Sequence, residues 1–202
     1  MTAPLVLALR HGATELSASG IFVGRSDPPL SPRGEEQAAG WRSLADSDLV
    51  TRVVASPLVR AGQTARIAGF TSIETDPDLI EWDLGDLEGR HAEQWRAAHP
   101  GWSLFVEGPP ASGERYADVA ARARRVIDSV DESSGLVVLV GHGQMLKVLA
   151  TELLGLSPDV AATFALGPAR AGLFLRRTAG WRLAGWNLPA PPTADSLLME
   201  LT

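Results

Sequence analysis

Residues 5–14 read LVLALRHGAT, an apolar run of strand length that ends abruptly in Arg10-His11-Gly12. A short apolar run bounded by polar residues or glycine is typical of a buried β-strand, and glycine tolerates the tight turn that follows. Ligands of open α/β sheets collect beyond the carboxyl ends of the strands, so a histidine and an arginine placed there are candidates for a nucleophile or a ligand that faces an anion. The tripeptide alone is equally compatible with simple turn chemistry.

Further apolar runs have the length of β-strands, and they alternate with segments of helical character. The predicted strands after the first cover 52–56, 71–75, 136–140, 161–166, 171–177 and 181–186, the last two joined as a hairpin around Ala179-Gly180. The predicted helices cover 31–44, the segment from after Pro57 to 68, 93–98, 114–130 and 144–154. Strands that alternate with helices predict an α/β fold, a three-layer sandwich whose mainly parallel central sheet carries helices on both faces.

The segments between these elements are expected to be loops. Residues 15–30 are rich in Ser, Gly and Pro, and residues 79–90 mix acidic, apolar and glycine residues as an ordered loop does. The segment at about 90–113 is expected to be a lid-like excursion over the surface. The tail, 188–202, is expected to lie against the body of the protein.

Composition narrows the class of protein. The 202 residues, 45% hydrophobic and 21% charged, suit a single globular domain with a core of its own. A formal net charge of −6 argues against nucleic acid as a partner. The absence of cysteine excludes disulfides, thiolate nucleophiles and cysteine-ligated zinc. No run of ~18 apolar residues predicts a membrane span, and the apolar start is too short for a signal peptide, so we expect a cytoplasmic protein without a membrane partner. The last hairpin and the tail could serve a homodimer interface, although nothing in the sequence requires one.

Potential cations stand at or just beyond the ends of three predicted strands. Arg10-His11 follow the first strand, Arg60 comes shortly after the second, and His142 follows the most apolar one. The carboxyl ends of parallel strands lie at one edge of a sheet, so these side chains can meet, together with Glu81 from the acidic loop. Arginine forks match phosphate oxygens, and helix N-termini add backbone N–H donors. The sequence therefore predicts an anion pocket with an acid beside it.

Such a pocket suits phosphoryl transfer. A histidine nucleophile can take a phosphoryl group onto a ring nitrogen when neighbouring cations spread the charge of the transferring group. The leaving oxygen then needs a proton, which a carboxylic acid beside apolar residues can supply, and Glu81 stands between Ile80 and Trp82. No metal is needed for this chemistry, and the sequence offers no convincing set of metal ligands.

Five motifs in this order resemble the histidine phosphatases, the phosphoglycerate-mutase-like superfamily. They are LALRHGAT at 7–14, PLSPRGEEQA at 29–38, ASPLVRAGQTA at 55–65, EWDLGDLEG at 81–89 and VLVGHGQ at 138–144. The resemblance covers roughly residues 5–187 and implies a phosphoglycerate-mutase-like fold that forms a single histidine phosphatase domain.

The resemblance also implies roles for particular residues and no cofactor. His11 would be the phosphorylated nucleophile, and Glu81 would be the proton donor and later the base for water. The residues expected to bind the phosphoryl group are Arg10, Arg60, His142, Ser17 and Gly24. Ser17 departs from the family pattern, because many members have asparagine there, and Arg25 replaces a common aromatic residue.

Within the superfamily the chain looks more like the broad-specificity phosphatases than the mutases. The run EWDLGDLEG resembles the phosphatase form, and the basic residues that mutases use for the phosphoglycerate carboxylate have no clear match between His91 and Ser112. We therefore expect a metal-independent, acid-phosphatase-like hydrolase of a small phosphomonoester. The first alternative is a cofactor-dependent phosphoglycerate mutase, and the second is a non-catalytic phosphate-binding module.

Several other residues carry expectations about their surroundings. His91 and His99 are expected to face solvent. Three aromatic residues should either line the substrate or pack the lid: Trp82, Trp102 and Phe105. Three arginines of the predicted helix 114–130 are expected to form a solvated face: Arg122, Arg124 and Arg125.

Overall fold

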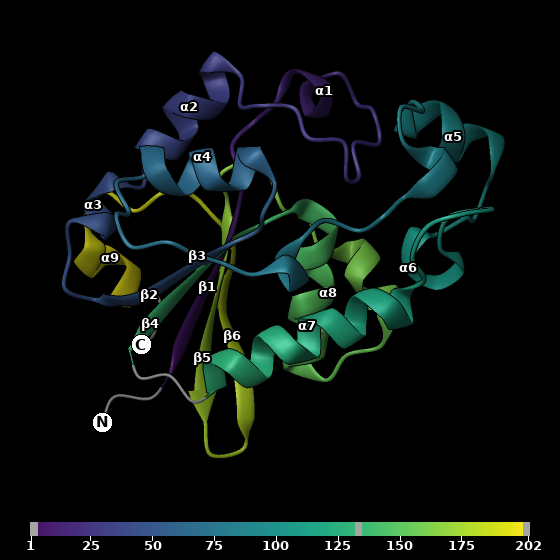
Figure 1. Cartoon of the computed structure of the whole chain (residues 1–202). Helices are drawn as coiled ribbons and strands as arrows, with labels where there is room; N and C mark the ends of the chain where they lie inside the picture. The colour runs from purple at the N-terminus through teal and green to yellow at the C-terminus, as the bar shows by residue number, and fades with distance from the viewer. Residues whose placement is uncertain (1–3, 132–134, 200–202) are drawn as a thin grey trace.

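The computed structural model describes residues 4–131 and 135–199, in which six strands form one sheet (Figure 1). The strands are β1 (Leu5–Arg10), β2 (Val50–Ala55), β3 (Glu74–Thr75), β4 (Leu136–Gly141), β5 (Ala171–Arg177) and β6 (Gly180–Leu188). Their order in the sheet is β3-β2-β4-β1-β5-β6. The first four are parallel, whereas β5 runs antiparallel to β1 and forms a hairpin with β6.

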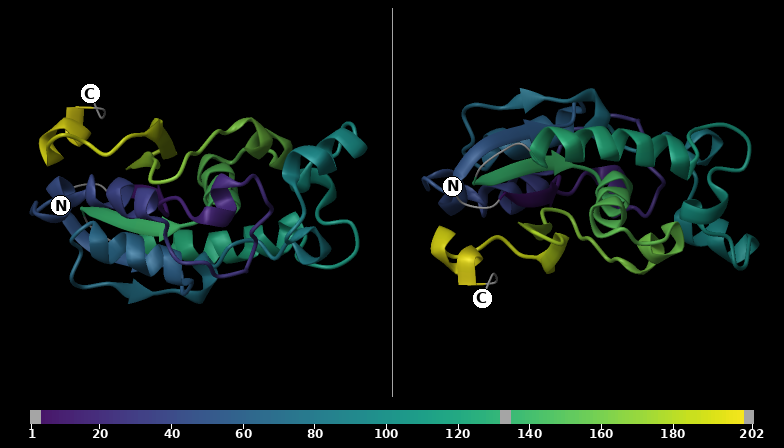
Figure 2. Two further views of the ribbon diagram at one scale, coloured as in Figure 1. Left: turned by 90° about the horizontal axis from the view of Figure 1, so that it is seen from above. Right: turned by 90° about the horizontal axis from the view of Figure 1, so that it is seen from below.

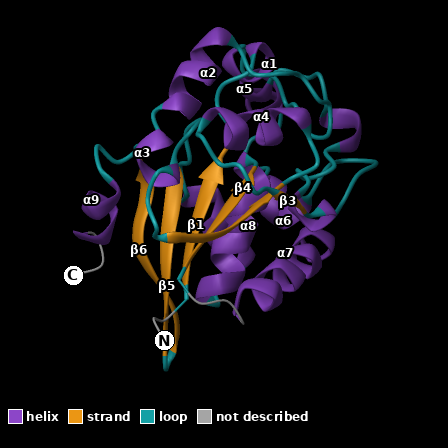
Figure 3. Cartoon of the chain, turned by 60° about the vertical axis from the view of Figure 1, so that its left-hand side comes forward, coloured by secondary structure: helices purple, strands orange, loops and turns teal. Residues whose placement is uncertain are grey.

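The register of β1 against β4 brings two strand ends together. The pairing runs from Leu5 opposite Leu136 to Arg10 opposite Gly141. The backbone N–H of His11 continues the ladder by donating to the carbonyl of Gly141 at 3.0 Å. The residues that follow these strands therefore emerge side by side at the carboxyl edge, where the loops gather around the strand arrowheads (Figure 3).

Helices cover both faces of the sheet, as the alternation of strands and helices predicted (Figures 1 and 3). One face carries α2 (Pro32–Ala39), α3 (Arg42–Ala45), α4 (Val59–Ile67) and α9 (Ala194–Met199); the other carries α7 (Tyr116–Asp131) and α8 (Gly143–Leu154). Successive side chains of β1 point to opposite faces, so Leu7 and Leu9 join one core and Val6 and Ala8 the other. The predicted three-layer α/β sandwich is confirmed.

The expected lid contains two short helices, α5 (Ala92–Ala98) and α6 (Leu104–Glu107), which extend at one end of the molecule (Figure 2). The remaining short elements are α1 (Glu15–Ala18), η1 (Pro77–Leu79), η2 (Gly85–Leu87) and η3 (Pro158–Thr163). In the described ranges no helix is both long and apolar enough to cross a membrane.

One predicted strand, 161–166, is wrong. The segment from Pro158 to Thr163 is the 3₁₀-helix η3, and Ala161 is buried in the core beside α8. The strand that pairs with β1 on this side is β5, and the segment around Ala161 packs against α8 instead of joining the sheet.

Other boundaries also differ from expectation. The predicted helix 31–44 breaks into α2 and α3 around Trp41, whose buried indole donates to the carbonyl of Ala169 at 3.0 Å. The predicted loop 15–30 contains α1, and the tail forms α9 before residues 200–202, which lie outside the described residues.

Two glycines allow the start of α2 to lie directly on the turn after His11. A Cβ atom on Gly12 would be 2.3 Å from the carbonyl oxygen of Gly34, and one on Gly34 would be 2.0 Å from that of Ala13. The Ser31 N–H donates to the same Ala13 carbonyl at 2.9 Å. Backbone packed this closely leaves no room for any side chain, so the turn that carries His11 depends on both glycines.

We predict that Gly34→Ala lowers the free energy of unfolding by about 3 kcal/mol, because the new methyl group meets backbone that cannot rotate away. Urea denaturation measures this change. Gly62→Ala in α4 is the matched control, since its Cβ would meet only the flexible end of Arg66, at 3.3 Å. That control should raise stability by up to about 1 kcal/mol through helix propensity. Equal effects of the two substitutions would contradict the close crossing.

Candidate active site

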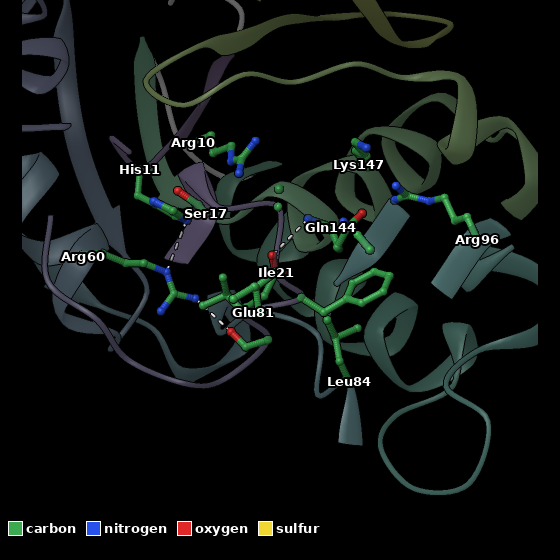
Figure 4. Close-up of a pocket in the computed structure, with 16 residues that line it drawn as sticks. Arg10, His11, Ser17, Ile21, Arg60, Glu81, Leu84, Arg96, Gln144 and Lys147 are labelled. Atoms are coloured by element: carbon green, nitrogen blue, oxygen red, sulfur yellow. Dashed lines mark hydrogen bonds between the residues drawn. The ribbon is translucent and has the colours of Figure 1, made fainter. Parts of the chain in front are cut away.

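A pocket of about 260 Å³ opens at the carboxyl edge of the sheet (Figure 4). Six residues predicted from the sequence line it: Arg10, His11, Ser17, Gly24, Arg60 and Glu81. Three polar side chains that were not predicted also line it: Arg96, Gln144 and Lys147. The volume suits a small metabolite, because it lies just below the roughly 300–1,000 Å³ that is usual for drug-sized ligands.

His11 is held as a neutral imidazole. Its Nδ1 lies 2.7 Å from the carbonyl oxygen of Gly12, an acceptor, so Nδ1 carries the proton and donates. Its Nε2 lies 3.2 Å from Arg60 Nε, a donor, so Nε2 presents its lone pair. Burial holds the pKa of His11 well below its usual range, and the charges of Arg10 and Arg60 act in the same direction. The ring nitrogen beside the two arginines is therefore an unprotonated nitrogen.

Arg60 is almost completely buried and fixes the loop that faces it. Its Nη1 donates to the carbonyl of Ser26 at 2.7 Å and its Nη2 to that of Gly24 at 2.9 Å. Asp27 lies 3.5 Å from Nη1. The contact that Gly24 makes is therefore with Arg60, through its carbonyl oxygen.

Arg10 and Ser17 make contacts that leave them at the pocket wall. Arg10 Nη1 donates to the carbonyl of Leu166 at 2.6 Å, while its buried Nε has no hydrogen-bond partner among the described residues. The Ser17 hydroxyl donates to the Thr14 carbonyl at 3.0 Å and accepts from the Thr14 N–H at 2.9 Å, which completes the cap of α1. A phosphate contact by Ser17 would require its hydroxyl to turn away from Thr14.

Glu81 is held by backbone N–H groups at the start of α8. Its Oε1 accepts from Met145 at 2.9 Å, and its Oε2 accepts from Gln144 at 3.1 Å. The N–H of the next residue, Trp82, also donates to Oε1 at 2.9 Å. Helix N-termini favour negative charge, so this location accounts for an acid that lies in the same pocket as two arginines.

His142 lies fully buried behind His11, with 5.2 Å between the ring centroids, and it is absent from the lining of the pocket. Its Nε2 is 2.7 Å from Ser56 Oγ, while its buried Nδ1 has no partner within the described ranges. Burial holds the pKa of His142 well below its usual range, and electrostatic interactions with His11, Arg60 and Arg10 lower it further. The sequence analysis did not predict Ser56 as a site residue. Its position directly after β2 and before Pro57, at the carboxyl edge of the sheet, could have indicated it.

Arg122 was predicted to lie on a solvated face, and this prediction is wrong. Its side chain is buried; Nη1 donates to the carbonyls of Asp78 and Ile80 at 2.7 and 2.9 Å, and Nη2 pairs with Glu114 at 2.8 Å. The loop carbonyls and the carboxylate of Glu114 satisfy a cation that helical spacing alone places on the polar side. The other two arginines of this helix are exposed, as expected: Arg124 and Arg125.

The pair Arg122–Glu114 forms hydrogen bonds with the chain on both sides of Glu81. Arg122 donates to carbonyls of residues that precede Glu81. After Glu81, the Glu114 carboxylate accepts the N–H of Asp83 at 3.1 Å, and the Glu114 carbonyl accepts the indole N–H of Trp82 at 2.8 Å. Arg25 joins this group: its Nε donates to the Glu81 carbonyl at 3.3 Å, and its Nη2 lies 3.0 Å from Glu114. Arg25 therefore supports the loop of Glu81.

The three aromatic residues expected to line the substrate or to pack the lid have different surroundings. Trp82 is fully buried and packs edge-on against Phe105, with 5.7 Å between the ring centroids. Trp102 and Phe105 line a second cavity that adjoins the pocket. His91 and His99 are exposed, as predicted.

Comparisons with known proteins agree on the kind of protein that this fold and pocket define. The family model of the histidine phosphatase superfamily (branch 1) matches residues 6–189. A probable phosphoglycerate mutase, GpmB, of Yersinia enterocolitica is 32% identical over 90% of this chain and 89% of its own length. An acid phosphatase of Mycobacterium tuberculosis is 35% identical over 83% of this chain and 84% of its own length.

Solved structures give the same answer. The product of the open reading frame Rv3214 of Mycobacterium tuberculosis superposes with a TM-score of 0.85 at 32% identity, over 93% of this chain and 99% of the other. A mycobacterial glucosyl-3-phosphoglycerate phosphatase superposes with a TM-score of 0.80 at 30% identity, over 92% of this chain and 100% of the other. The class is thus an α/β protein of phosphoglycerate-mutase-like fold. The chain belongs to the histidine phosphatase superfamily, as the resemblance implied.

We predict that His11 stays neutral on acidification through pH ~6.5, where an ordinary histidine takes up a proton. The lowered pKa of His11 means that the neutral form persists below that pH, and Arg60→Gln should raise this pKa by removing one of the two cations. Nitrogen-15 NMR of the His11 ring in the unaltered protein and in the variant measures the titration. Protonation of His11 near pH 6.5 in the unaltered protein would contradict the assignment.

Proposed function

We propose that this protein is a metal-independent phosphomonoester hydrolase that acts through a phosphohistidine on a small phosphorylated metabolite. The observation that carries the proposal is the position of His11 Nε2, which accepts a hydrogen bond from Arg60 in the pocket that Arg10 and Glu81 also line. A neutral ring nitrogen is a nucleophile, the two guanidinium groups match phosphoryl oxygens, and a carboxyl group can move the protons. The phosphatases among the relatives support the same class of reaction.

In the first step, His11 Nε2 attacks phosphorus, and the P–N bond forms as the bond from phosphorus to the ester oxygen breaks. Glu81 gives a proton to the departing alcohol; that proton must first be supplied to Glu81, because the backbone N–H groups that hold it favour the carboxylate form. The proton on Nδ1 stays there and is donated to the Gly12 carbonyl, 2.7 Å away, which keeps the ring in place while it becomes cationic. In-line geometry requires the leaving oxygen to face away from His11.

In the second step, Glu81, now a carboxylate, takes a proton from water as the water oxygen attacks phosphorus. The P–N bond breaks, its electron pair returns to His11, and inorganic phosphate leaves. The net reaction converts one ester and one water into one alcohol and one phosphate.

The other predicted residues stabilise the phosphoryl group in different ways. The positive charges of Arg10 and Arg60 offset the negative charge on its oxygens. The Nδ1 of His142, buried behind His11, has no partner in the described residues. When Ser56 donates to His142 Nε2, this Nδ1 carries the proton and can donate to the phosphoryl group. Gly24 acts through its carbonyl on Arg60. Ser17 would add a hydroxyl donor from the wall of the pocket.

A phosphoglycerate mutase is the second candidate, because relatives 30–32% identical to this chain are called probable phosphoglycerate mutases. A mutase must pass the phosphoryl group from His11 to a second alcohol faster than water takes it. Incubation with 3-phosphoglycerate separates the two activities: we expect inorganic phosphate to appear faster than 2-phosphoglycerate, and the opposite order would favour the mutase.

We predict that His11→Ala abolishes phosphate release and the covalent intermediate, while the fold survives, because His11 is the only histidine among the described residues that line the pocket. A phosphorus-32 ester, quenched in alkali to preserve the acid-labile phosphohistidine, measures the intermediate; circular dichroism measures the fold. Activity is measured in EDTA throughout.

The exposed His91→Ala is the matched control and should keep both the intermediate and turnover. Substantial release of phosphate by the His11→Ala variant in EDTA would contradict the mechanism.

We also predict that Glu81→Gln slows esters of poor leaving groups most. General acid catalysis contributes about 10²–10⁴-fold, so alkyl phosphates should lose about that much in phosphorylation rate, and 4-nitrophenyl phosphate, which leaves without a proton, should lose far less. Burst kinetics across a leaving-group series measures this dependence. The exposed Glu93→Gln in α5 is the control; equal slowing across the series would exclude Glu81 as the acid.

A further inference from the structure

The pocket continues into a second cavity of about 170 Å³ beneath the lid. The two cavities share four lining residues: Phe22, Arg96, Gln144 and Lys147. The remaining wall is largely apolar and comes from the segment 102–105 of the lid. Shared walls make the two cavities neighbouring parts of one binding region.

The shared wall carries two cations. Lys147, which is the only lysine in the sequence, places Nζ 5.7 Å from the ring centroid of Phe105. Arg96 places its guanidinium carbon 5.7 Å from the ring centroid of Phe22. In the described part of the chain neither forms an ion pair or donates a hydrogen bond. Burial lowers the pKa of Lys147 to about 8, with Arg10 acting in the same direction, as expected of a cation that lacks a counter-charge.

Two uncharged polar side chains that line the second cavity also lack hydrogen-bond partners among the described residues. The side-chain oxygens of Gln144 and Ser103 are buried without a partner among the described residues. Buried polar groups nearly always have a hydrogen-bond partner, in the protein or in ordered water or ligand. The second cavity thus offers two positive charges, one acceptor and one hydroxyl next to apolar surface.

The direction of the proposed reaction leads from the first cavity to the second. Lys147 and Arg96 lie across the pocket from His11 and Arg60, with Glu81 and Gln144 between them (Figure 4). The leaving alcohol must face away from the attacking nitrogen and toward the acid that protonates it. Its carbon part therefore extends toward the second cavity.

We propose that the second cavity binds the alcohol part of the substrate, and that Lys147 and Arg96 select a phosphomonoester whose alcohol carries a second anionic group, a carboxylate or a phosphate. This assignment rests on the proposed function. The segment 102–105 covers the carbon skeleton, and the side chains of Gln144 and Ser103 bond to hydroxyl or N–H groups on it. Lys147 and Arg96 are thus residues for specificity, distinct from the arginines that hold the transferred phosphoryl group.

The test compares two esters that differ in charge and hardly in shape, 3-(phosphonooxy)propanoate and its primary amide. We expect kcat/KM for the acid to exceed that for the amide at least tenfold. Lys147→Met and Arg96→Gln should each remove most of this preference by slowing the acid at least fivefold while the amide changes less than threefold. Lys147→Arg, which retains the positive charge, should keep the preference for the acid. Propane-1,3-diyl bisphosphate distinguishes a phosphate from a carboxylate as the preferred second anion.

The matched control is Arg90→Gln, because Arg90 is exposed and absent from the lining of both cavities. This variant should prefer the acid to the amide by the same factor as the unaltered protein. Equal slowing of acid and amide by Lys147→Met would place Lys147 on the transferred phosphoryl group and overturn the inference. So would hydrolysis of acid and amide at equal rates by the unaltered protein.

A binding measurement separates this inference from the proposed function. A single lysine yields a single side-chain nitrogen-15 signal, which can be followed in the unaltered protein during titration with 3-hydroxypropanoate, the alcohol product, or its amide. We expect the acid alone to shift the Lys147 signal. Failure to hydrolyse any ester, 4-nitrophenyl phosphate included, would overturn the proposed function; an unshifted Lys147 signal in a protein that does hydrolyse 4-nitrophenyl phosphate would overturn only the inference.

Discussion

The contact between Arg60 and His11 organises the whole carboxyl edge of the sheet. A buried guanidinium must have its donors satisfied, and Arg60 takes the carbonyls of Gly24 and Ser26 on one side and the ring of His11 on the other. The same loop is held from below by Glu88, which accepts the N–H groups of Arg25 and Ser26 at 2.8 and 3.1 Å. The loop, the start of α4 and the histidine are therefore positioned as one unit.

The positive charge of this unit has a direct chemical consequence. Burial and two nearby arginines lower the pKa of His11, so the ring favours the neutral form that the proposed nucleophile requires. Glu81, the proposed acid, is positioned differently: backbone N–H groups at the N-terminus of α8 donate to both of its carboxylate oxygens. The site thus uses burial to keep one group neutral and backbone dipoles to position the other.

The loop of Glu81 needs its own support because it has no regular secondary structure at that residue. The Arg122–Glu114 pair provides it by bonding to carbonyl and N–H groups on both sides. A buried ion pair of this kind costs desolvation energy. Its justification here is the fixed position that it imposes on a loop whose side chain enters the pocket.

Much of the architecture could be predicted from the sequence, because the patterns that indicate these strands and helices involve residues close together in the chain. The apolar runs of β1 and β4 and the start of the helix predicted from residue 31 depend on neighbours in the chain, and the structure confirms them. The failures came where the partner was distant. Residues 161–166 have strand-like composition, but the 3₁₀-helix over Pro158–Thr163 buries Ala161 in the core instead. Arg122 has the spacing of a solvated residue, but it donates to loop carbonyls more than forty positions away.

The sequence by itself determined the order of the motifs, hence the family, the three-layer fold and the short set of residues that can carry charge to one edge of the sheet. Only the tertiary structure decided the protonation of His11, the contact of Gly24 with Arg60 and the meeting of Arg96 with Lys147 at one wall. The reason is physical: a motif specifies which groups are present, whereas a pKa, a buried pair or a cavity depends on which groups from distant parts of the chain share the same few ångströms and exclude water from them.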